Sequence, residues 1–169
     1  MIKEFKGDYA FLSNFFLALQ EVYHEYFARS FLYPSNEHYF QAMKTLDLGQ
    51  HIAISNAPTP GIAKKMGSRR GFMMGNGVLF KIVLRPDWNN IKLGVMSRGV
   101  EHKIRQHPNL LHLLLKTYPM DLQEGNWWGD DFWGVCFKRG KGYNHLGSII
   151  KILRGILLSE HLKAMERPA

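Results

Sequence analysis

Residues 34–46 read PSNEHYFQAMKTL and mark the point at which the chain changes from short strands to helices. Ser35 or Asn36 can cap a helix that begins here, because their short polar side chains accept hydrogen bonds from the first free backbone N–H groups. We expect this helix to run to about Leu46. Its two faces differ in character, one carrying Tyr39, Ala42, Met43 and Leu46 and the opposite one carrying Glu37, Gln41 and Lys44.

The polar face of this helix has two interpretations. Glu37 and Lys44 lie about two turns apart, roughly 10 Å along the axis, so backbone geometry does not pair them directly but lets them face one ligand. The simpler interpretation is a polar face that points to water, with Glu37 in the first turn, where the helix dipole favours a carboxylate. The spacing alone favours the solvent-facing interpretation.

The segments on either side predict an α+β domain in which helices predominate. Residues 1–33 alternate short aromatic and apolar runs with polar residues, which is typical of short strands or a hairpin. Thr59-Pro60 opens a further helix that Gly67 closes. A glycine-rich loop (68–77) then leads into VLFKIVL (78–84), a candidate strand. The remaining expected helices run from Asp87 to about His107, from Pro108 to Leu115 and from Leu146 to Met165.

The helix expected after Asp87 carries two apolar stripes, one with Trp88, Ile91 and Val95 and the other with Leu93, Met96, Val100 and Ile104. A helix that is apolar on two sides is usually central and buried. No repeat and no long linker divides the chain. We therefore expect a single compact domain over residues 1–169, with a small β element near the N-terminus.

Composition and charge indicate a globular protein with anionic partners. Of the 169 residues 46% are hydrophobic and 21% charged, and no apolar run reaches the roughly 20 residues of a membrane span. The opening MIKEFKGDYA lacks the apolar core of a secretory signal, and the lone Cys136 excludes an intrachain disulfide, so we expect a cytoplasmic location. Lys and Arg exceed Asp and Glu by 22 to 14, a net charge of +8. This excess favours nucleic acid or phosphorylated small molecules, although the basic residues form no dense block.

A second unusual segment is WGDDFWG (128–134), where three of the four tryptophans surround the pair Asp130-Asp131. Gly125, Gly129 and Gly134 indicate irregular backbone. Carboxylates among indole rings suit a nucleobase or sugar site, because the rings stack on a base and a carboxylate stabilises an oxocarbenium-like transition state. A small aromatic core cluster is the alternative, and the segment taken alone favours it.

Metal and dinucleotide sites are not indicated. The eight histidines show no H-E-x-x-H pattern and no facial-triad spacing, and there is no cysteine pair. The GNG at 75–77 lacks the full glycine spacing of a dinucleotide fingerprint. We expect no metal and no cofactor.

Six further stretches occur in a characteristic order: FLSNF (11–15), YPSNEHYFQAMK (33–44), an AxTPxxAKxxG-like run (57–67), LRPDWNNIKLGVM (84–96), LLLKTYPMDLQEGNWWGDDFWGV (113–135) and GKGYNHLGSIIKILR (140–154). With them the chain resembles the NADAR/YbiA-like family along nearly its whole length. The resemblance implies a helix-rich fold and an N-glycosidase. A Gly/Met-rich segment, residues 71–83, stands where many relatives are shorter, and we expect it to shape the pocket rim.

The resemblance implies one of two substrate classes. The first is the ribosylamino-pyrimidine phosphates of the riboflavin pathway. The second is ADP-ribose attached to guanine, free or in nucleic acid. The family's active-site positions correspond here to Glu37, Trp88 and Asp130, with Lys44 at the end of the EHYFQAxK motif.

From these residues we expect the following roles. Glu37 positions or deprotonates the attacking water, or stabilises charge at the anomeric carbon, and Asp130 is its partner at the ribose. A second route uses Lys44, whose amine, if its pKa is depressed, captures the opened sugar as a Schiff base. The expected substrate contacts are Trp88, Trp133, Asn14 and Asn144, with Lys64, Lys65, Arg69 and Arg70 as phosphate ligands or, alternatively, as a solvated basic turn.

Two non-enzymatic alternatives stay open. The domain is then either a reader that binds ADP-ribose or NAD without turnover, or a basic nucleic-acid-binding protein whose aromatic rings stack on exposed bases. The sequence does not predict an oligomeric state.

Overall fold

The computed structural model describes residues 1–166. Its backbone contacts divide the chain into two units, one formed by Asn14–Gln106 and the other by Met1–Ser13 with His107–Ala169. The expected α+β class, predominantly helical with a small sheet near the N-terminus, is confirmed. The prediction of a single domain over the whole chain stays a prediction.

The first unit opens with the expected hairpin of β1 (Leu17–His24) and β2 (Arg29–Ser35), which pair antiparallel. Alternate residues of β1 are buried, as a strand with one covered face requires. Ala28 in the connecting turn adopts a left-handed conformation with a φ of 51°. The hairpin ends at Ser35, where the helical part begins.

Helix α1 (Asn36–Ala42) starts where it was predicted, because the Ser35 hydroxyl accepts a hydrogen bond from the backbone N–H of His38. It ends four residues before the predicted Leu46. The reason is a second N-cap: the Asp47 carboxylate accepts a hydrogen bond of 2.8 Å from the backbone N–H of Gln50 and starts α2 (Leu48–Ser55). The sequence analysis did not predict α2.

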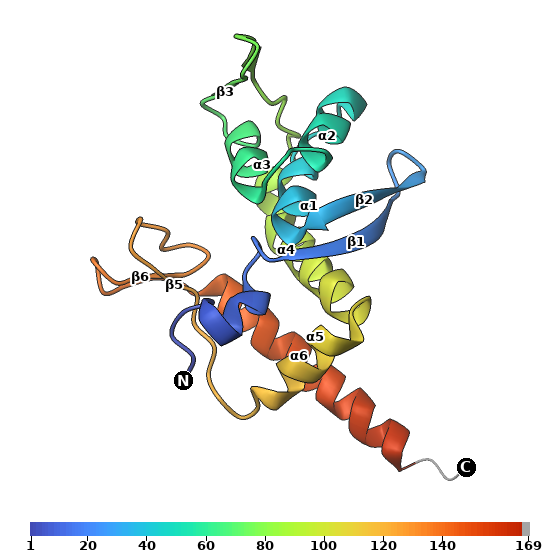
Figure 1. The fold of residues 1–169 in the computed structure, drawn as a ribbon, viewed down its shortest axis with the longest axis vertical. Coiled ribbons are helices and arrows are strands. Elements are labelled where there is room, and N and C mark those ends of the chain that lie inside the picture. The colour runs from blue at the N-terminus through green and yellow to red at the C-terminus, as the bar shows by residue number, and fades with distance from the viewer. Residues whose placement is uncertain (167–169) are drawn as a thin grey trace. The chain divides into compact units, whose positions relative to one another are not determined.

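Helix α3 (Pro60–Met66) is confirmed with both its ends. The Thr59 hydroxyl accepts the N–H of Ile62 at 3.2 Å, and Gly67 follows the last turn. Figure 1 shows α2 and α3 beside α1, with the β1–β2 hairpin next to them. Every residue of α1 is buried as a result.

Helix α4 (Trp88–Arg105) confirms the long helix expected after Asp87, and most of both apolar stripes is buried, although Leu93 is exposed. It packs closely on α1 because Gly99 has no side chain. A Cβ at this position would overlap Asn36 and the Tyr39 ring. Between α3 and α4 the chain forms a short hairpin of β3 (Phe72–Met73) and β4 (Leu79–Phe80), so the candidate strand over 78–84 is only two residues long. A two-stranded ribbon without a covered face has little to extend it.

The second unit comprises the 3₁₀ helix η1 (Gly7–Leu12), α5 (Pro108–Lys116), the parallel pair β5 (Gly125–Asn126) and β6 (Val135–Cys136), and α6 (His145–Met165). Helices α5 and α6 confirm the predicted segments to within a residue. The buried guanidinium of Arg154 on α6 donates to Thr117 and to the carbonyl of Met120 at 2.9–3.0 Å. These bonds hold the segment after α5 to α6.

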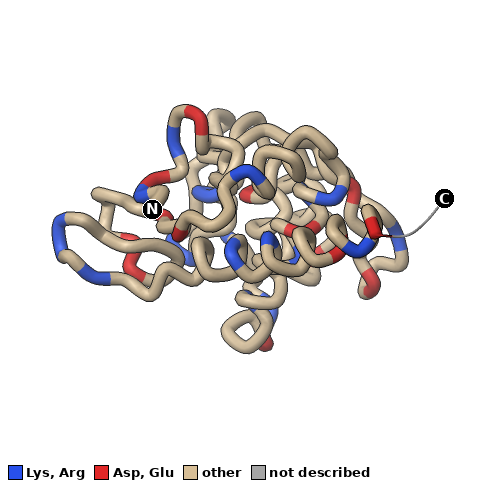
Figure 2. Tube along the Cα trace, turned by 90° about the horizontal axis from the view of Figure 1, so that it is seen from below, with Lys and Arg blue, Asp and Glu red and all other residues tan. Residues whose placement is uncertain are grey.

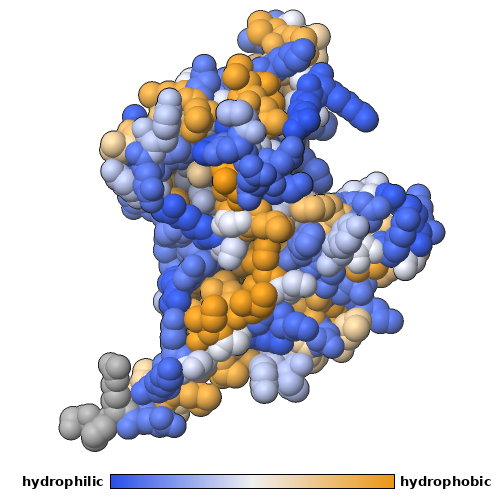
Figure 3. Space-filling model, turned by 180° about the vertical axis from the view of Figure 1, so that it is seen from behind, coloured by the Kyte–Doolittle hydropathy of each residue, from blue (hydrophilic) through white to orange (hydrophobic). Residues whose placement is uncertain are grey.

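Charged side chains are spread over the surface, between exposed apolar ones. Figure 2 shows lysines and arginines spread over the trace, in agreement with a net charge of +8 that has no dense block. On the face in Figure 3, apolar side chains gather in patches that polar side chains border. Within residues 1–166, no helix has the length and apolar character needed to span a membrane.

Candidate active site

Glu37 is buried in the first turn of α1, with 5% of its surface exposed. Its backbone N–H donates to the carbonyl of Asn14 at 2.9 Å, and its carboxylate accepts a 2.7 Å hydrogen bond from the Gln41 amide one turn along. Gln41 is buried as well. The interpretation of this face as solvent-directed is therefore wrong, because neighbouring segments cover α1 on every side.

Lys44 follows α1 on the same side as Glu37. Its ammonium donates to the carbonyl of Gly67 at 3.1 Å. Burial lowers the pKa of Lys44 to about 8, an effect that the Glu37 carboxylate opposes and that the positive charges of Lys64 and Arg69 reinforce. Glu37 and Lys44 thus interact electrostatically, an interaction that the spacing along the helix did not predict.

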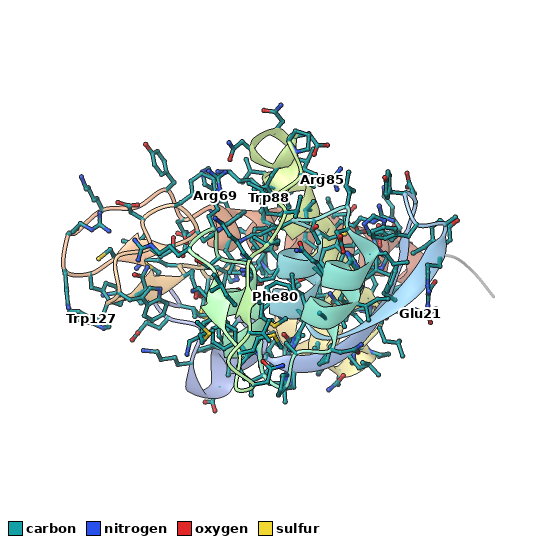
Figure 4. The ribbon with its side chains drawn as sticks, turned by 90° about the horizontal axis from the view of Figure 1, so that it is seen from above. Glu21, Arg69, Phe80, Arg85, Trp88 and Trp127 are labelled. Atoms are coloured by element: carbon teal, nitrogen blue, oxygen red, sulfur yellow. The ribbon has the colours of Figure 1, made fainter. Side chains whose placement is uncertain are left out.

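An aromatic wall stands beside the amine. The Phe40 and Trp88 rings pack with centroids 5.0 Å apart, and the Lys44 nitrogen lies 5.5 Å from the first centroid and 5.8 Å from the second. Trp88 is the first residue of α4 and is 6% exposed (Figure 4). A low-dielectric wall of this kind favours the neutral amine over the ammonium ion.

The basic residues divide into two groups. Lys64 on α3 and Arg69 in the following turn act electrostatically on Lys44, and Figure 4 shows Arg69 on the same side of the unit as Trp88. The amine of Lys64 also lies 5.5 Å from the Phe15 ring centroid, and the amine of Lys65 lies 5.8 Å from the Phe72 ring centroid. Arg69 and Arg70 are both exposed. The first group has the charge and accessibility to hold a phosphate.

Asn14 braces α1 with its side chain as well as with its backbone. The amide oxygen accepts from Asn36 at 2.7 Å, and the amide nitrogen lies 3.3 Å from the sulfur of Met96. Its predicted contact with substrate stays a prediction. Gln41, Phe40 and Gly67 join the site without having been singled out as site residues, although Gln41 had been placed on the same helix face as Glu37.

The WGDDFWG loop belongs to the other unit and is held by hydrogen bonds within that unit. The Asp130 carboxylate accepts the backbone N–H groups of Phe132 at 3.1 Å and Trp133 at 2.9 Å. The buried Asn126 side chain donates to the Asp130 carbonyl at 2.6 Å and accepts from the Asp130 N–H at 3.0 Å. Asp131 forms an exposed ion pair with Arg139 at 2.7 Å. Asp130 therefore shapes this loop, and its predicted role at the ribose stays a prediction.

The tryptophans of this loop do not form a core cluster. Trp127 and Trp128 are 53% and 62% exposed, and Trp133 is half-buried with its ring edge-on to Phe132. The core-cluster interpretation is therefore wrong for the first two. In the same unit the Asn144 amide accepts from the Glu124 N–H and donates to the Leu122 carbonyl, so it holds the entry to α6. Contacts of Trp133 and Asn144 with substrate stay predictions.

Residues 1–166 contain no group of three or more His, Cys, Asp and Glu side chains placed to hold a metal ion. The Glu37 site itself offers a carboxylate, an amide, an amine and two aromatic rings.

Replacing Gly67 by Ala tests how tightly this site is packed. A Cβ at this position would overlap the Gln41 side chain, so we expect Gln41 to shift away from Glu37. Overpacking of this kind costs about 1–3 kcal/mol of unfolding free energy, measured by urea denaturation. The matched control is Gly75→Ala, because a Cβ there meets nothing within 4 Å. Equal stability of the two variants contradicts the packing described here.

A protein-family model matches this chain over most of its length. The model described as "NADAR domain" matches residues 2–158. The chain belongs to the NADAR family. The resemblance inferred from the motifs is confirmed.

Proteins similar to this chain carry two kinds of name. "N-glycosidase YbiA" of Escherichia coli strain K12 is 36% identical over 128 residues, which cover 76% of this chain and 72% of that protein. "Riboflavin biosynthesis protein PYRR, chloroplastic" of Zea mays is 30% identical over 136 residues, which cover 76% of this chain but 20% of the maize protein. The NMR structure of E. coli YbiA superposes with a TM-score of 0.75 at 32% identity, covering 100% of this chain and 90% of YbiA. Membership in the NADAR family and these similarities support an N-glycosidase activity.

Proposed function

We propose that this protein hydrolyses the bond between ribose C1 and the exocyclic amine of a pyrimidinone or guanine-like base, in a phosphorylated ribosylamine of the riboflavin-pathway type. The observation that carries the proposal is the amine of Lys44, with its lowered pKa, beside the Glu37 carboxylate and the Phe40–Trp88 wall. The names of the similar proteins agree with a ribosylated substrate.

The amine of Lys44 is suited to nucleophilic attack. With a pKa of about 8, about a tenth of it is neutral at pH 7, whereas an ordinary lysine with a pKa of about 10.4 is neutral to only about 0.04%. Only the neutral amine has the lone pair that attacks carbon. Burial therefore increases the reactive fraction more than a hundredfold.

The reaction begins when the ribose ring opens. An exocyclic N–H lets the nitrogen lone pair expel the ring oxygen, which takes up a proton, and leaves an iminium at C1. Lys44 adds to C1, the base leaves as its free amine, and a lysine Schiff base remains. Water then adds to C1 and releases the ribose aldehyde and the Lys44 amine, so the net reaction consumes one water.

Glu37 supports these steps as the proton-transfer group. Its carboxylate accepts the proton that Lys44 loses on attack and returns it to the leaving amine. Gln41 fixes the orientation of the carboxylate through the 2.7 Å hydrogen bond. In the alternative route Glu37 deprotonates a water that attacks C1 directly, with no covalent intermediate.

The candidates for phosphate binding are the basic residues that act electrostatically on the Lys44 amine. Lys64 and Arg69 have both charge and exposure, and Arg70 is a further candidate by position. Asp130 stays a predicted site residue on the ground of the family motif, and Trp133 and Asn144 stay predicted substrate contacts. A cytoplasmic location, expected from the single Cys136, is part of the same proposal.

A second candidate activity is removal of ADP-ribose from guanine in nucleic acid. It uses the same chemistry, because ADP-ribose on the guanine amino group is also attached to an exocyclic nitrogen. The net charge of +8 favours a polyanionic substrate. A reader that binds ADP-ribose without turnover is the non-enzymatic alternative.

The deciding experiment compares substrates by the position of the glycosidic nitrogen. The protein is incubated with a ribosylamino-pyrimidine phosphate, with guanine-ADP-ribosylated DNA and with guanosine monophosphate, whose ribose is attached to a ring nitrogen without N–H. Mass spectrometry follows the released base. We expect release from the ribosylamino-pyrimidine phosphate and none from guanosine monophosphate.

Each other outcome overturns a stated part of the proposal. Cleavage of guanosine monophosphate at a similar rate contradicts the need for an exocyclic N–H. Release only from the DNA selects the second candidate activity. Tight binding of ADP-ribose with no release from any substrate identifies a reader.

A further inference from the structure

A pocket lies on the face of α1 opposite Glu37, within residues 14–106. On a helix, Tyr39 is rotated by about 200° from Glu37, so the two side chains leave the axis on opposite sides. Tyr39 and Met43 line a pocket of about 270 Å³ together with Tyr33, Arg85, Ile91 and Arg98. An adjoining hollow of about 310 Å³ continues along α4 past Gly94 and shares Tyr39, Met43, Ile91 and Arg98.

The pocket contains buried polar groups that lack a partner. Among the described residues, the Tyr39 hydroxyl makes no hydrogen bond, although none of the side chain is exposed. Burial raises the pKa of Tyr39 to about 12, so its hydroxyl stays protonated and able to donate. His24 lines the same pocket at 5% exposure, with neither ring nitrogen bonded within residues 1–166. Buried polar groups without partners are rare in folded proteins, and a bound ligand is one reason for them.

Positive charge flanks these groups. Arg85 is a part-buried lining residue, next to Trp88 in Figure 4, and its guanidinium forms a double hydrogen bond with Asp87 at 2.6 and 2.9 Å. Arg98 donates to the Tyr23 carbonyl at 3.2 Å and stands 3.7 Å from the carboxylate of Glu25. Glu25 is 81% exposed, so water weakens this ion pair. The Arg98 guanidinium can therefore bind an anion that is better placed than Glu25.

We propose that this pocket binds a small organic anion, a phosphate monoester or a carboxylate with one aromatic ring. Arg98 holds the acid group, Tyr39 donates to it or to a neighbouring oxygen, and the ring lies between Met43, Ile91 and Tyr33. The size of the pocket fits one ring with its acid group, at the lower end of small-molecule sites. The site is separate from that of Glu37 and Lys44, and its existence does not depend on the proposed glycosidase activity.

The test measures binding of defined probes by NMR. Methionine methyl groups are labelled with ¹³C, and Met43→Leu identifies the Met43 signal. The probes are phenyl phosphate, benzoate, inorganic phosphate and phenol. We expect phenyl phosphate or benzoate to shift the Met43 methyl signal at millimolar concentrations. Phenol, which has the ring but no charge, should not, and inorganic phosphate should bind more weakly than phenyl phosphate.

Two variants locate the contacts. Arg98→Gln and Tyr39→Phe should each weaken binding about tenfold or more, because each removes a hydrogen bond to a charged group. Arg105→Gln, on the exposed part of the same helix, removes the same charge outside the pocket and should change nothing. Unfolding curves confirm that each variant is folded, and Arg98→Lys replaces Arg98→Gln if the latter is not.

Three results overturn the proposal. One is the absence of any Met43 shift with both aromatic acids. Another is unchanged affinity in folded Arg98→Gln and Tyr39→Phe. The last is loss of binding in Glu37→Gln, which would place the anion in the other site. A failure of the glycosidase assay leaves these binding results unaffected, so the two proposals fail separately.

Discussion

A Glu37→Gln variant should lose about 10²- to 10⁴-fold in kcat, the usual contribution of a positioned acid–base group. The change keeps the volume of the side chain and an oxygen that accepts the 2.7 Å hydrogen bond from Gln41. It removes the charge that takes up a proton. Because the packing is conserved, KM should change little, and steady-state kinetics with the ribosylated substrate measure both constants.

The matched control is Glu21→Gln on β1. Glu21 is exposed and is labelled in Figure 4 on the opposite side from Arg69. Its loss should leave kcat and KM unchanged. Turnover near the wild-type level in Glu37→Gln shows that the assignment of Glu37 is wrong.

Lys44→Met should reduce kcat by at least about 100-fold, equivalent to about 2.7 kcal/mol of activation free energy. The methionine side chain fills the same space but has no amine. In the wild type the neutral fraction of Lys44 rises with pH up to its pKa of about 8, so kcat should rise towards pH 8 and then level off. Borohydride added during turnover should reduce the Schiff base and leave a ribose adduct on Lys44, which peptide mass spectrometry locates.

A rate that falls above pH 8, with no adduct on Lys44, contradicts the Schiff base. If Lys44 acts only as a cation, the rate falls above pH 8 as the ammonium loses its proton, and no adduct forms. That result leaves direct attack by water at Glu37 as the mechanism. Lys81→Met, at an exposed position in the same unit, is the control for general loss of positive charge.

Local signals explain which elements the sequence predicted. The caps at Ser35 and Thr59 and the proline that starts α5 act within a few residues, so α1, α3 and α5 begin where expected. The early end of α1 depends on competition between two possible helices. Asp47 caps α2 at that point, and the apolar periodicity around Leu46 does not reveal it. Boundaries of this kind follow from tertiary context.

In the candidate site, too, the sequence predicted the features that local spacing sets and missed those that tertiary contacts set. Helical spacing placed Glu37, Gln41 and Lys44 on one face, and the family motif added Trp88. Burial of that face was missed, because it depends on Asn14 and on the turn at Gly67, which are distant in sequence. The lowered pKa of Lys44 follows from this burial, so no spacing rule could have predicted it.

Burial beside the two aromatic rings leaves Lys44 with a pKa well below that of an ordinary surface lysine. At pH 8 about half of this amine is neutral, compared with about 0.4% of an ordinary one. An activated ester at low stoichiometry should therefore acylate Lys44 before other lysines that it can equally reach. The same desolvation that prepares the residue for a sugar makes it a selective point of attachment for covalent inhibitors and for probes of pocket occupancy.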